Sequence, residues 1–182
     1  MKAAGSHEER LELWSEVLQL DEFEVVHQAE NSETKSWQLT VVPKVAVAVC
    51  PHCGILSREI HQQRDREGIR DLPLGQRAVM LRVRVFEFWC VNCERAFTPP
   101  RKSLAAGTHA TERFLERAAR LIRHGDIQNV ASFLGVPEKT LERWYYDYVE
   151  RQQQQPQANL QPITSVGVDE LSQKKDTGNS WP

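Results

Sequence analysis

Two cysteine pairs constrain the fold of this chain more than any other feature of its sequence. The pairs are CPHC, with Cys50 and Cys53, and CVNC, with Cys90 and Cys93, and 36 residues lie between them. Two thiolates three positions apart on a tight turn can bind one tetrahedral ion, and a second pair completes a four-sulfur shell at about 2.3 Å per bond. A closed shell leaves no coordination position for a substrate. The spacing therefore predicts a structural zinc ion that holds a small ribbon together.

Two other uses of the four cysteines stay open from the spacing alone. An iron site of the rubredoxin kind uses similar pairs and would carry electrons. A disulfide framework would need an oxidising compartment, and the first residues, MKAAGSHEERLELW, turn acidic where a secretion signal would turn apolar. His52 lies between the first two thiols, but four sulfurs already complete the shell, so we interpret it as a bystander.

Composition is that of a soluble globular protein. Of the 182 residues, 40% are hydrophobic and 26% are charged, and the mean hydropathy is -0.54. No stretch approaches the roughly 18 consecutive apolar residues that a transmembrane helix needs. We therefore expect a cytoplasmic protein without a membrane partner.

The formal net charge of -2 hides an uneven distribution of charged residues along the chain. Residues 1–35 carry a net charge of -6, residues 36–124 one of +7, and residues 125–182 one of -3. The positive middle segment favours a polyanionic partner such as nucleic acid, although a solvated basic face would have the same composition.

Hydrophobic periodicity predicts an α+β chain built from small units. Apolar residues at helical spacing among charges predict an amphipathic helix over residues 7–20. Runs of β-branched and aromatic residues predict a hairpin of residues 23–29 and 37–42. A polar, arginine-rich stretch over residues 58–71 then precedes a strand expected over residues 78–89.

The arginines of the middle segment are candidates for contact with phosphate. Along the last of these strands apolar residues alternate with Arg82 and Arg84, so the pleat directs both guanidiniums outward. With Arg77 they are our DNA-binding candidates on the ribbon. Carboxylates such as Asp65 and Glu67 lie among these arginines in the sequence, so internal ion pairs are the alternative use of the same side chains.

Three helical segments follow the ribbon, and the last two match a helix-turn-helix. In VASFLGVPEKTLERW the small Ala131 would let two helices approach closely, and Gly135 would take the turn conformation. Leu141 and Trp144 would fill the space between the helices. The final helix would then enter the major groove of DNA. Its DNA-contacting candidates are Lys139, Thr140 and Arg143. An ordinary helical hairpin is the alternative, because such hairpins are common in proteins that never touch DNA.

Together these features resemble the ISL-three insertion-sequence transposases, which combine a zinc ribbon, a helix-turn-helix and a DDE catalytic domain. The resemblance rests on CPHCG, on IRDLPLGQRAVMLRVRVFEFWCVNCERAFT, on the helix-turn-helix and on VGVDELSQKK. It implies that the ribbon and the helix-turn-helix bind the element's terminal inverted repeats, which are double-stranded DNA. It also implies that VGVDE opens an RNase H-like domain in which Asp169 is the first acid of a metal-dependent triad.

The sequence departs from the family pattern after Asp169. Lys174 and Lys175 run into DTGNSWP, where the family has a basic continuation with glycine and histidine, and the other two acids do not follow. One carboxylate cannot hold two divalent ions in the required geometry. We therefore expect that this chain does not cut DNA, that Asp169 is an inactive remnant, and that a divalent metal belongs only to a complete catalytic domain.

Two functions are expected from these observations. The first is a sequence-specific DNA-binding portion of a transposase, with salt-sensitive binding. The second is a protein-interaction or regulatory module that pairs with a full-length transposase, or with itself, through its amino-terminal helix and hairpin.

The expected fold class is α+β, with five successive segments along the chain. They are an amino-terminal helix and β-hairpin (1–43), the zinc ribbon (44–102), the helix-turn-helix domain (103–151), a Gln/Pro linker (152–162) and a stub of the RNase H-like domain (163–182).

Overall fold

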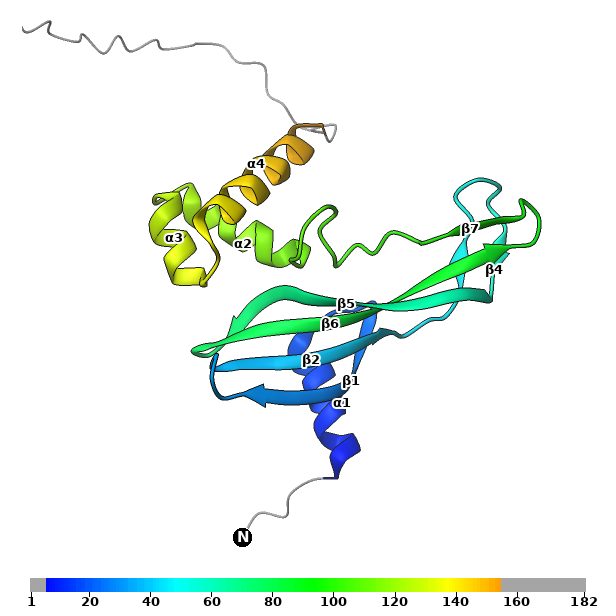
Figure 1. Cartoon of the computed structure of the whole chain (residues 1–182), viewed down its shortest axis with the longest axis horizontal. Coiled ribbons are helices and arrows are strands. Elements are labelled where there is room, and N and C mark those ends of the chain that lie inside the picture. The colour runs from blue at the N-terminus through cyan, green and yellow to red at the C-terminus, as the bar shows by residue number, and fades with distance from the viewer. Residues whose placement is uncertain (1–5, 155–182) are drawn as a thin grey trace, which may run out of the picture.

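The protein has the α+β fold class that the sequence predicts. A computed structural model describes residues 6–154, with four helices and a mixed β-sheet in that range. The elements in chain order are α1 (His7–Leu18), β1 (Phe23–Asn31), β2 (Ser36–Pro43), β3 (Ala48–Val49), β4 (Leu56–Ser57), β5 (Glu59–Leu74), β6 (Arg77–Cys90), β7 (Arg95–Phe97), α2 (Glu112–Ile122), α3 (Ile127–Leu134) and α4 (Glu138–Gln154). Figure 1 shows the sheet with the α2–α4 unit above it.

The long strand β6 organises the main sheet, whose order is β1-β2-β6-β5 with β7 paired to β6. β6 pairs in parallel with β2, from Ser36↔Ala78 to Val41↔Val83, and antiparallel with β5. Its far end pairs with β7, beyond the reach of β1 and β2. One strand therefore runs from the amino-terminal hairpin to the cysteine-bearing end of the molecule (Figure 1).

Side chains alternate along β6 as the sequence predicts. Val79, Leu81 and Val83 are at most 1% exposed and form the centre of the core under the sheet. Arg82, between two of them, is exposed on the other face. The pleat therefore buries one face of β6 and leaves the other face, which carries Arg82, more exposed.

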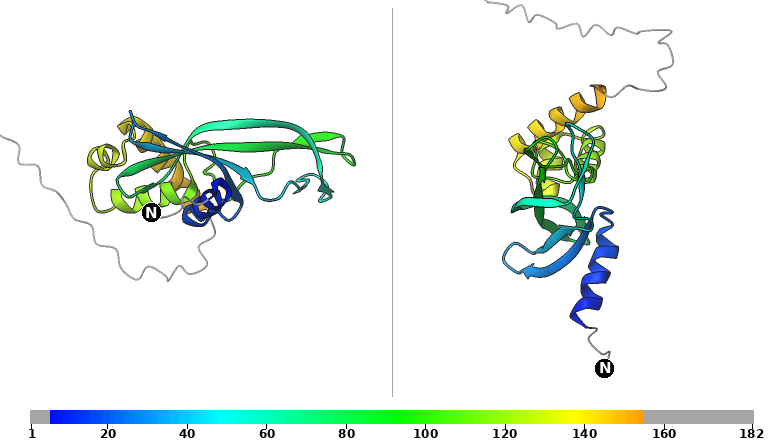
Figure 2. Two further views of the ribbon diagram at one scale, coloured as in Figure 1. Left: turned by 90° about the horizontal axis from the view of Figure 1, so that it is seen from below. Right: turned by 90° about the vertical axis from the view of Figure 1, so that its right-hand side faces the viewer.

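Helix α1 covers the buried face of this sheet. It begins with a capping box, in which Ser6 and Glu9 each accept a hydrogen bond from the other's backbone N–H. Trp14 packs edge-on against Trp37 of β2, with 4.9 Å between ring centroids, and its indole N–H donates to Gln28 at 2.7 Å. Figure 2 shows α1 on one side of the sheet.

Strand β5 is the main difference between the predicted and the observed elements. The arginine-rich stretch 58–71, expected only as a polar connection, is mostly strand and pairs with β6 along its length. Three register shifts relative to β6 break its alternation, and β5 lies at an edge of the sheet with most side chains exposed. The apolar period that marks a strand is therefore missing from its sequence.

The three carboxyl-terminal helices form a unit with a core of its own. The side chains of Thr111 and Asp126 are the N-caps of α2 and α3, and each accepts a hydrogen bond from a backbone N–H. α3 ends at Gly135, whose φ of +63° is the left-handed conformation expected for the turn. The core of the three-helix unit includes Phe114, Leu115, Ala118, Ala131, Leu141, Trp144 and Tyr148.

The segment before α2 attaches the helical unit to the edge of the sheet. The Arg70 N–H donates to the His109 carbonyl at 2.8 Å, and the Thr111 N–H donates to the Arg70 carbonyl at 2.9 Å. The Arg66 guanidinium donates to the Thr108 carbonyl at 3.0 Å. This short segment therefore lies beside β5 and brings α2 close to the sheet.

The expected segment boundaries and the observed elements do not coincide everywhere. β2 and β6, expected on either side of a boundary after residue 43, are direct neighbours in one sheet. α4 continues to Gln154, and the rest of the expected linker, the expected stub 163–182 and Asp169 lie outside the described residues. Between residues 6 and 154, no helix has the length and apolar character needed to cross a membrane.

Candidate metal centre and nucleic-acid interface

The four cysteines come together at one end of the molecule, as expected for a single metal site. Cys50 and Cys53 flank the turn from β3 to β4, and Cys90 and Cys93 flank the turn from β6 to β7. Their sulfur atoms lie within 4.8 Å of one another, with 3.8 Å between Cys50 and Cys93 and 3.5 Å between Cys53 and Cys90. A tetrahedral ion with sulfur bonds of about 2.3 Å separates its sulfurs by about 3.8 Å. The donor set therefore fits a tetrahedral thiolate site.

The two cysteine turns share one backbone feature. The residue after the second cysteine is left-handed in each turn, with φ of +74° at Gly54 and +52° at Glu94. In the first turn the Cys50 N–H donates to the Ile55 carbonyl, and the Gly54 N–H donates to the Cys50 carbonyl, both at 2.9 Å. Two similar turns thus present the two sulfur pairs toward each other.

The clustered thiols differ in their preference for the charged form. The pKa of Cys53 is lowered to about 6, chiefly because a backbone hydrogen bond at Ile55 favours its thiolate. The pKa of Cys93 is raised to about 12, chiefly by its hydrogen bond with Cys53 and then by burial. Additional thiolates in so small a cluster repel one another. A cation bound among the four sulfurs removes that repulsion, so the electrostatics favour a metal ion.

A small apolar cluster surrounds the cysteines. Cys50 and Cys90 are each 1% exposed, and the rings of Phe88 and Phe97 stack beside them with 6.0 Å between centroids. This cluster is separate from the larger core under α1 and has few residues. A core this small benefits from a metal cross-link. His52 is exposed and is not among the clustered donors.

The three DNA-contacting candidates of α4 lie at the amino-terminal end of that helix. Lys139 and Arg143 are exposed and one helical turn apart, and Thr140 is half-buried. Leu141 and Trp144, at 1% and 4% exposure, pack into the core with α2 and α3. The buried side chains fix the helix, so the two cations extend from a rigid element into solvent.

The three arginine candidates on the sheet each pair with a carboxylate. The pairs are Arg77 with Glu30, Arg82 with Glu67, and Arg84 with Asp65 at 3.3 Å. The structure therefore has internal ion pairs at all three arginines, which is the alternative that the sequence left open. The paired side chains are between 31% and 65% exposed. Ion pairs with this exposure are weak, so they do not prevent an exchange of partner.

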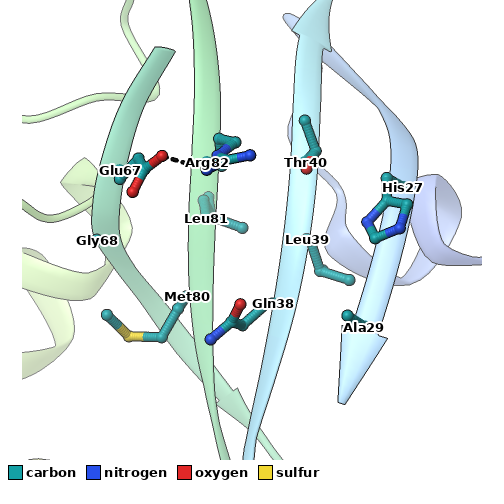
Figure 3. Close-up of a pocket in the computed structure, with 10 residues that line it drawn as sticks. All are labelled: His27, Ala29, Gln38, Leu39, Thr40, Glu67, Gly68, Met80, Leu81 and Arg82. Atoms are coloured by element: carbon teal, nitrogen blue, oxygen red, sulfur yellow. Dashed lines mark hydrogen bonds and ion pairs between the residues drawn. The ribbon is translucent and has the colours of Figure 1, made fainter. Parts of the chain in front are cut away.

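A shallow pocket lies on the open face of the sheet, beside Arg82 (Figure 3). Its volume is about 280 Å³, and its polar lining includes His27, Gln38, Thr40, Glu67 and Arg82. The Arg82 guanidinium points to the Glu67 carboxylate, which is the ion pair drawn in the figure. The one arginine and the one carboxylate of the lining neutralise each other, so this pocket offers no surplus charge to a phosphate.

A buried charged network, not foreseen from the sequence, joins the sheet to the helical unit. The Asp71 side chain in β5 is 0% exposed and accepts hydrogen bonds from the Thr111 hydroxyl at 2.7 Å and from Nε of Arg113 at 2.8 Å. A second guanidinium nitrogen of Arg113 also contacts it. The available signal was Asp71 itself, which lies between the apolar Ile69 and Leu72, but the polar residues before it obscured the signal.

Comparison with known proteins connects this architecture to a family. Residues 46–93, which include all four cysteines, match the family described as the zinc-finger of transposase IS204/IS1001/IS1096/IS1165. Over 91 residues the chain is 29% identical to the transposase for insertion sequence element IS1001 of Bordetella parapertussis. The alignment covers 50% of this chain and 22% of that transposase, so the chain corresponds to a minor part of its relative. No solved structure matches the chain. Residues 46–93 therefore match the zinc ribbon of the ISL-three transposases, as the motifs predicted, and half of the chain is similar to one such transposase.

Proposed function

We propose that the chain is the sequence-specific DNA-binding portion of a transposase and that it binds the terminal inverted repeats of an insertion sequence as double-stranded DNA. The family match supports the class of protein, because a transposase must recognise the ends of its element. The zinc ribbon and the helical unit would both contribute to binding.

The packing of α3 against α4 is the observation that carries this proposal. Ala131 is 2% exposed in α3, Gly135 forms the left-handed turn, and Leu141 of α4 is 1% exposed. The proposal is that this pair of helices acts as a helix-turn-helix, whose second helix enters the major groove. Lys139 and Arg143 then extend from the end of α4 that would enter the groove, where long cations reach guanine edges or phosphates.

Zinc is the ion that we propose for the four cysteines, in a structural role. A four-sulfur shell is complete, so the ion would stabilise the ribbon without activating water. Iron in the same shell would give a coloured, redox-active protein. Metal analysis of the purified chain separates the two: colourless protein with one zinc per chain supports the proposal, and red protein containing iron contradicts it.

The described residues would supply binding and no strand-transfer chemistry. Within residues 6–154, the four cysteines are the one group of three or more His, Cys, Asp or Glu side chains arranged to hold a metal ion. DDE chemistry needs converging carboxylates that hold two divalent ions. We propose that any such chemistry belongs to an RNase H-like region that starts near Asp169.

A second candidate function is pairing with a full-length transposase or with a second copy. Helix α1 supports it, because Leu13 and Val17 lie one turn apart on this acidic helix and are 58% and 44% exposed. Light scattering after gel filtration tests this candidate. Self-association that is lost in Leu13→Glu supports it, whereas a monomer that does not bind a transposase in a mixing experiment removes it.

Selection of duplexes from a random-sequence pool tests the DNA-binding proposal without the need to choose a target sequence. The zinc-loaded full chain should enrich a common motif over successive rounds, and the Arg143→Ala variant should enrich it less strongly. A pool that stays random with the wild-type chain would contradict sequence-specific binding.

A further inference from the structure

A second cleft lies where the sheet meets the end of α3. Its volume is about 440 Å³. One wall contains the turns of the β1–β2 and β5–β6 hairpins, including Lys35 and Gln76, and the other contains Phe133 and Gly135 at the end of α3. Figure 1 shows both hairpin turns on the same side of the molecule as α3.

Two cations line this cleft without a carboxylate that neutralises them. Neither Lys35 nor Arg70 forms an ion pair with any other residue in the part of the chain that the structure describes. Asp71 also lines the cleft, but its side chain is 0% exposed and is engaged by Thr111 and Arg113. The cleft therefore has a surplus of positive charge, unlike the pocket in Figure 3.

Arg70 is held in the cleft by the turn that leads into α4. Its Nη1 donates to the Leu134 carbonyl at 3.4 Å, at the end of a helix where exposed carbonyls favour a cation. A Cβ at Gly135 would lie 3.9 Å from the same nitrogen, so the guanidinium packs directly against the turn. Partial burial lowers the pKa of Arg70, because it removes water from the charged form. A pre-positioned guanidinium of this kind suits the paired oxygens of a phosphate.

The cleft adjoins the end of α4 that would contact bases. Gly135, in the cleft wall, lies three residues before Glu138, the first residue of α4. Phe133 is 78% exposed in the same wall and offers an apolar surface to a sugar ring. A duplex whose bases lie against Lys139 and Arg143 would bring its backbone to this side of the helix.

We infer that this cleft is a binding site for one backbone phosphate of duplex DNA and that Arg70 and Lys35 hold this phosphate. The inference rests on the proposed DNA-binding function and extends its interface from the helical unit to the sheet. The β1–β2 turn and β5 would contact the backbone while α4 contacts bases. Such contacts position the protein and add affinity for any sequence.

The dependence of affinity on salt, measured with a duplex of random sequence, tests this inference. The variants are Lys35→Gln, Arg70→Gln and Arg70→Lys, and Lys44→Gln is the matched control because Lys44 is an exposed cation beside α1, away from the cleft. Each phosphate contact contributes about 0.9 to the slope of log affinity against log salt. Because both cations hold the same phosphate, we expect the magnitude of the slope to fall in Lys35→Gln and in Arg70→Gln, in each case by at most about 0.9. Arg70→Lys should keep most of it, and Lys44→Gln should match the wild type.

Several outcomes decide whether the cleft is a phosphate-binding site. If the wild-type chain binds duplex and both Lys35→Gln and Arg70→Gln keep its slope, the phosphate site is overturned and the proposed function is left intact. A wild-type chain that does not bind duplex would overturn both. Arg70 also contacts Leu134, so circular dichroism is compared first. If Arg70→Gln does not fold, the test rests on Lys35→Gln, because Lys35 is exposed. An unchanged slope in that variant overturns the phosphate site.

Discussion

The carboxylate of Asp71 accepts hydrogen bonds from two nitrogens of the Arg113 guanidinium, 42 residues further along the chain. Asp71 lies in β5 with a fully buried side chain, and Arg113 lies in the first turn of α2 with 29% exposure. Thr111, the N-cap of α2, donates to the same carboxylate. This contact fixes the helical unit against the edge of the sheet, so it sets where α4 lies relative to the ribbon.

Replacement of Asp71 by asparagine should destabilise the protein strongly. Asp71→Asn keeps the shape of the side chain but leaves the Arg113 guanidinium without its anion at a largely buried position. Breaking a buried pair from one side costs about 3 kcal/mol of unfolding free energy. Chemical denaturation followed by circular dichroism measures this loss.

The matched control for Asp71→Asn is Glu116→Gln, which removes the exposed pair between Glu116 and Arg120 in α2. An exposed pair one helical turn apart contributes about 0.5 kcal/mol or less. Equal small losses in the two variants would contradict the importance of Asp71 at the junction.

Loss of one cysteine should release the metal and unfold the ribbon end of the molecule. Cys90→Ser removes one of the four sulfurs, and the small cluster around Phe88 and Phe97 has little other support. His52→Ala should retain the metal, because His52 is exposed and outside the sulfur cluster. Metal content per chain and near-ultraviolet circular dichroism check both variants, and a metal-loaded Cys90→Ser chain would contradict the four-sulfur site.

The capping carboxylate of Asp126 should make the stability of α3 depend on pH in the acid range. Its pKa is lowered, chiefly because the backbone N–H of Asn129 donates to the charged form at 2.8 Å. A lowered folded-state pKa contributes stability that is present above the ordinary carboxyl pKa and is lost as the pH falls through the lowered value.

Comparison of Asp126→Asn with the wild type isolates this carboxylate. Any loss of metal in acid affects both chains equally and cancels in the difference of their melting temperatures. That difference should be constant at neutral pH and should shrink as the solution is acidified below the ordinary carboxyl pKa. A difference that does not change with pH would contradict a role for the charged cap.

Sequence patterns predicted the elements whose causes are local. The two CxxC pairs predicted one sulfur cluster, because short turns hold their own ligands. Alternation along β6 predicted the buried Val79, Leu81 and Val83, and Asp126 with Gly135 predicted both ends of α3. Each of these signals lies within a few residues of the structure that it specifies.

Features that depend on distant parts of the chain were not predictable in this way. β5 is polar and irregular in sequence, and its pairing with β6 compensates for the missing apolar period. The parallel pairing of β2 with β6 joins segments whose connection carries the first cysteine turn, so no hairpin signal marks it. Asp71 has two side-chain partners, Thr111 and Arg113, and both follow it in the sequence by 40 residues or more.

Arg143 should contribute to DNA affinity without contributing to the fold. Its side chain is exposed on α4, so Arg143→Ala should leave the melting temperature unchanged. If Arg143 contacts a base, its loss costs about 1 to 3 kcal/mol of binding free energy. Arg10→Ala, which removes an exposed arginine from α1, is the control and should bind as the wild type does. Equal affinities for Arg143→Ala and Arg10→Ala would place the base-reading helix elsewhere.

The most direct measurement is a titration of the zinc-loaded chain with the terminal repeats of the neighbouring insertion element and with scrambled duplex of equal length, at several salt concentrations. We expect the chain to prefer the repeats by about 4 kcal/mol or more, with affinity falling as salt rises. Equal weak binding to the two duplexes, or no binding to either, would contradict the proposed DNA-binding function.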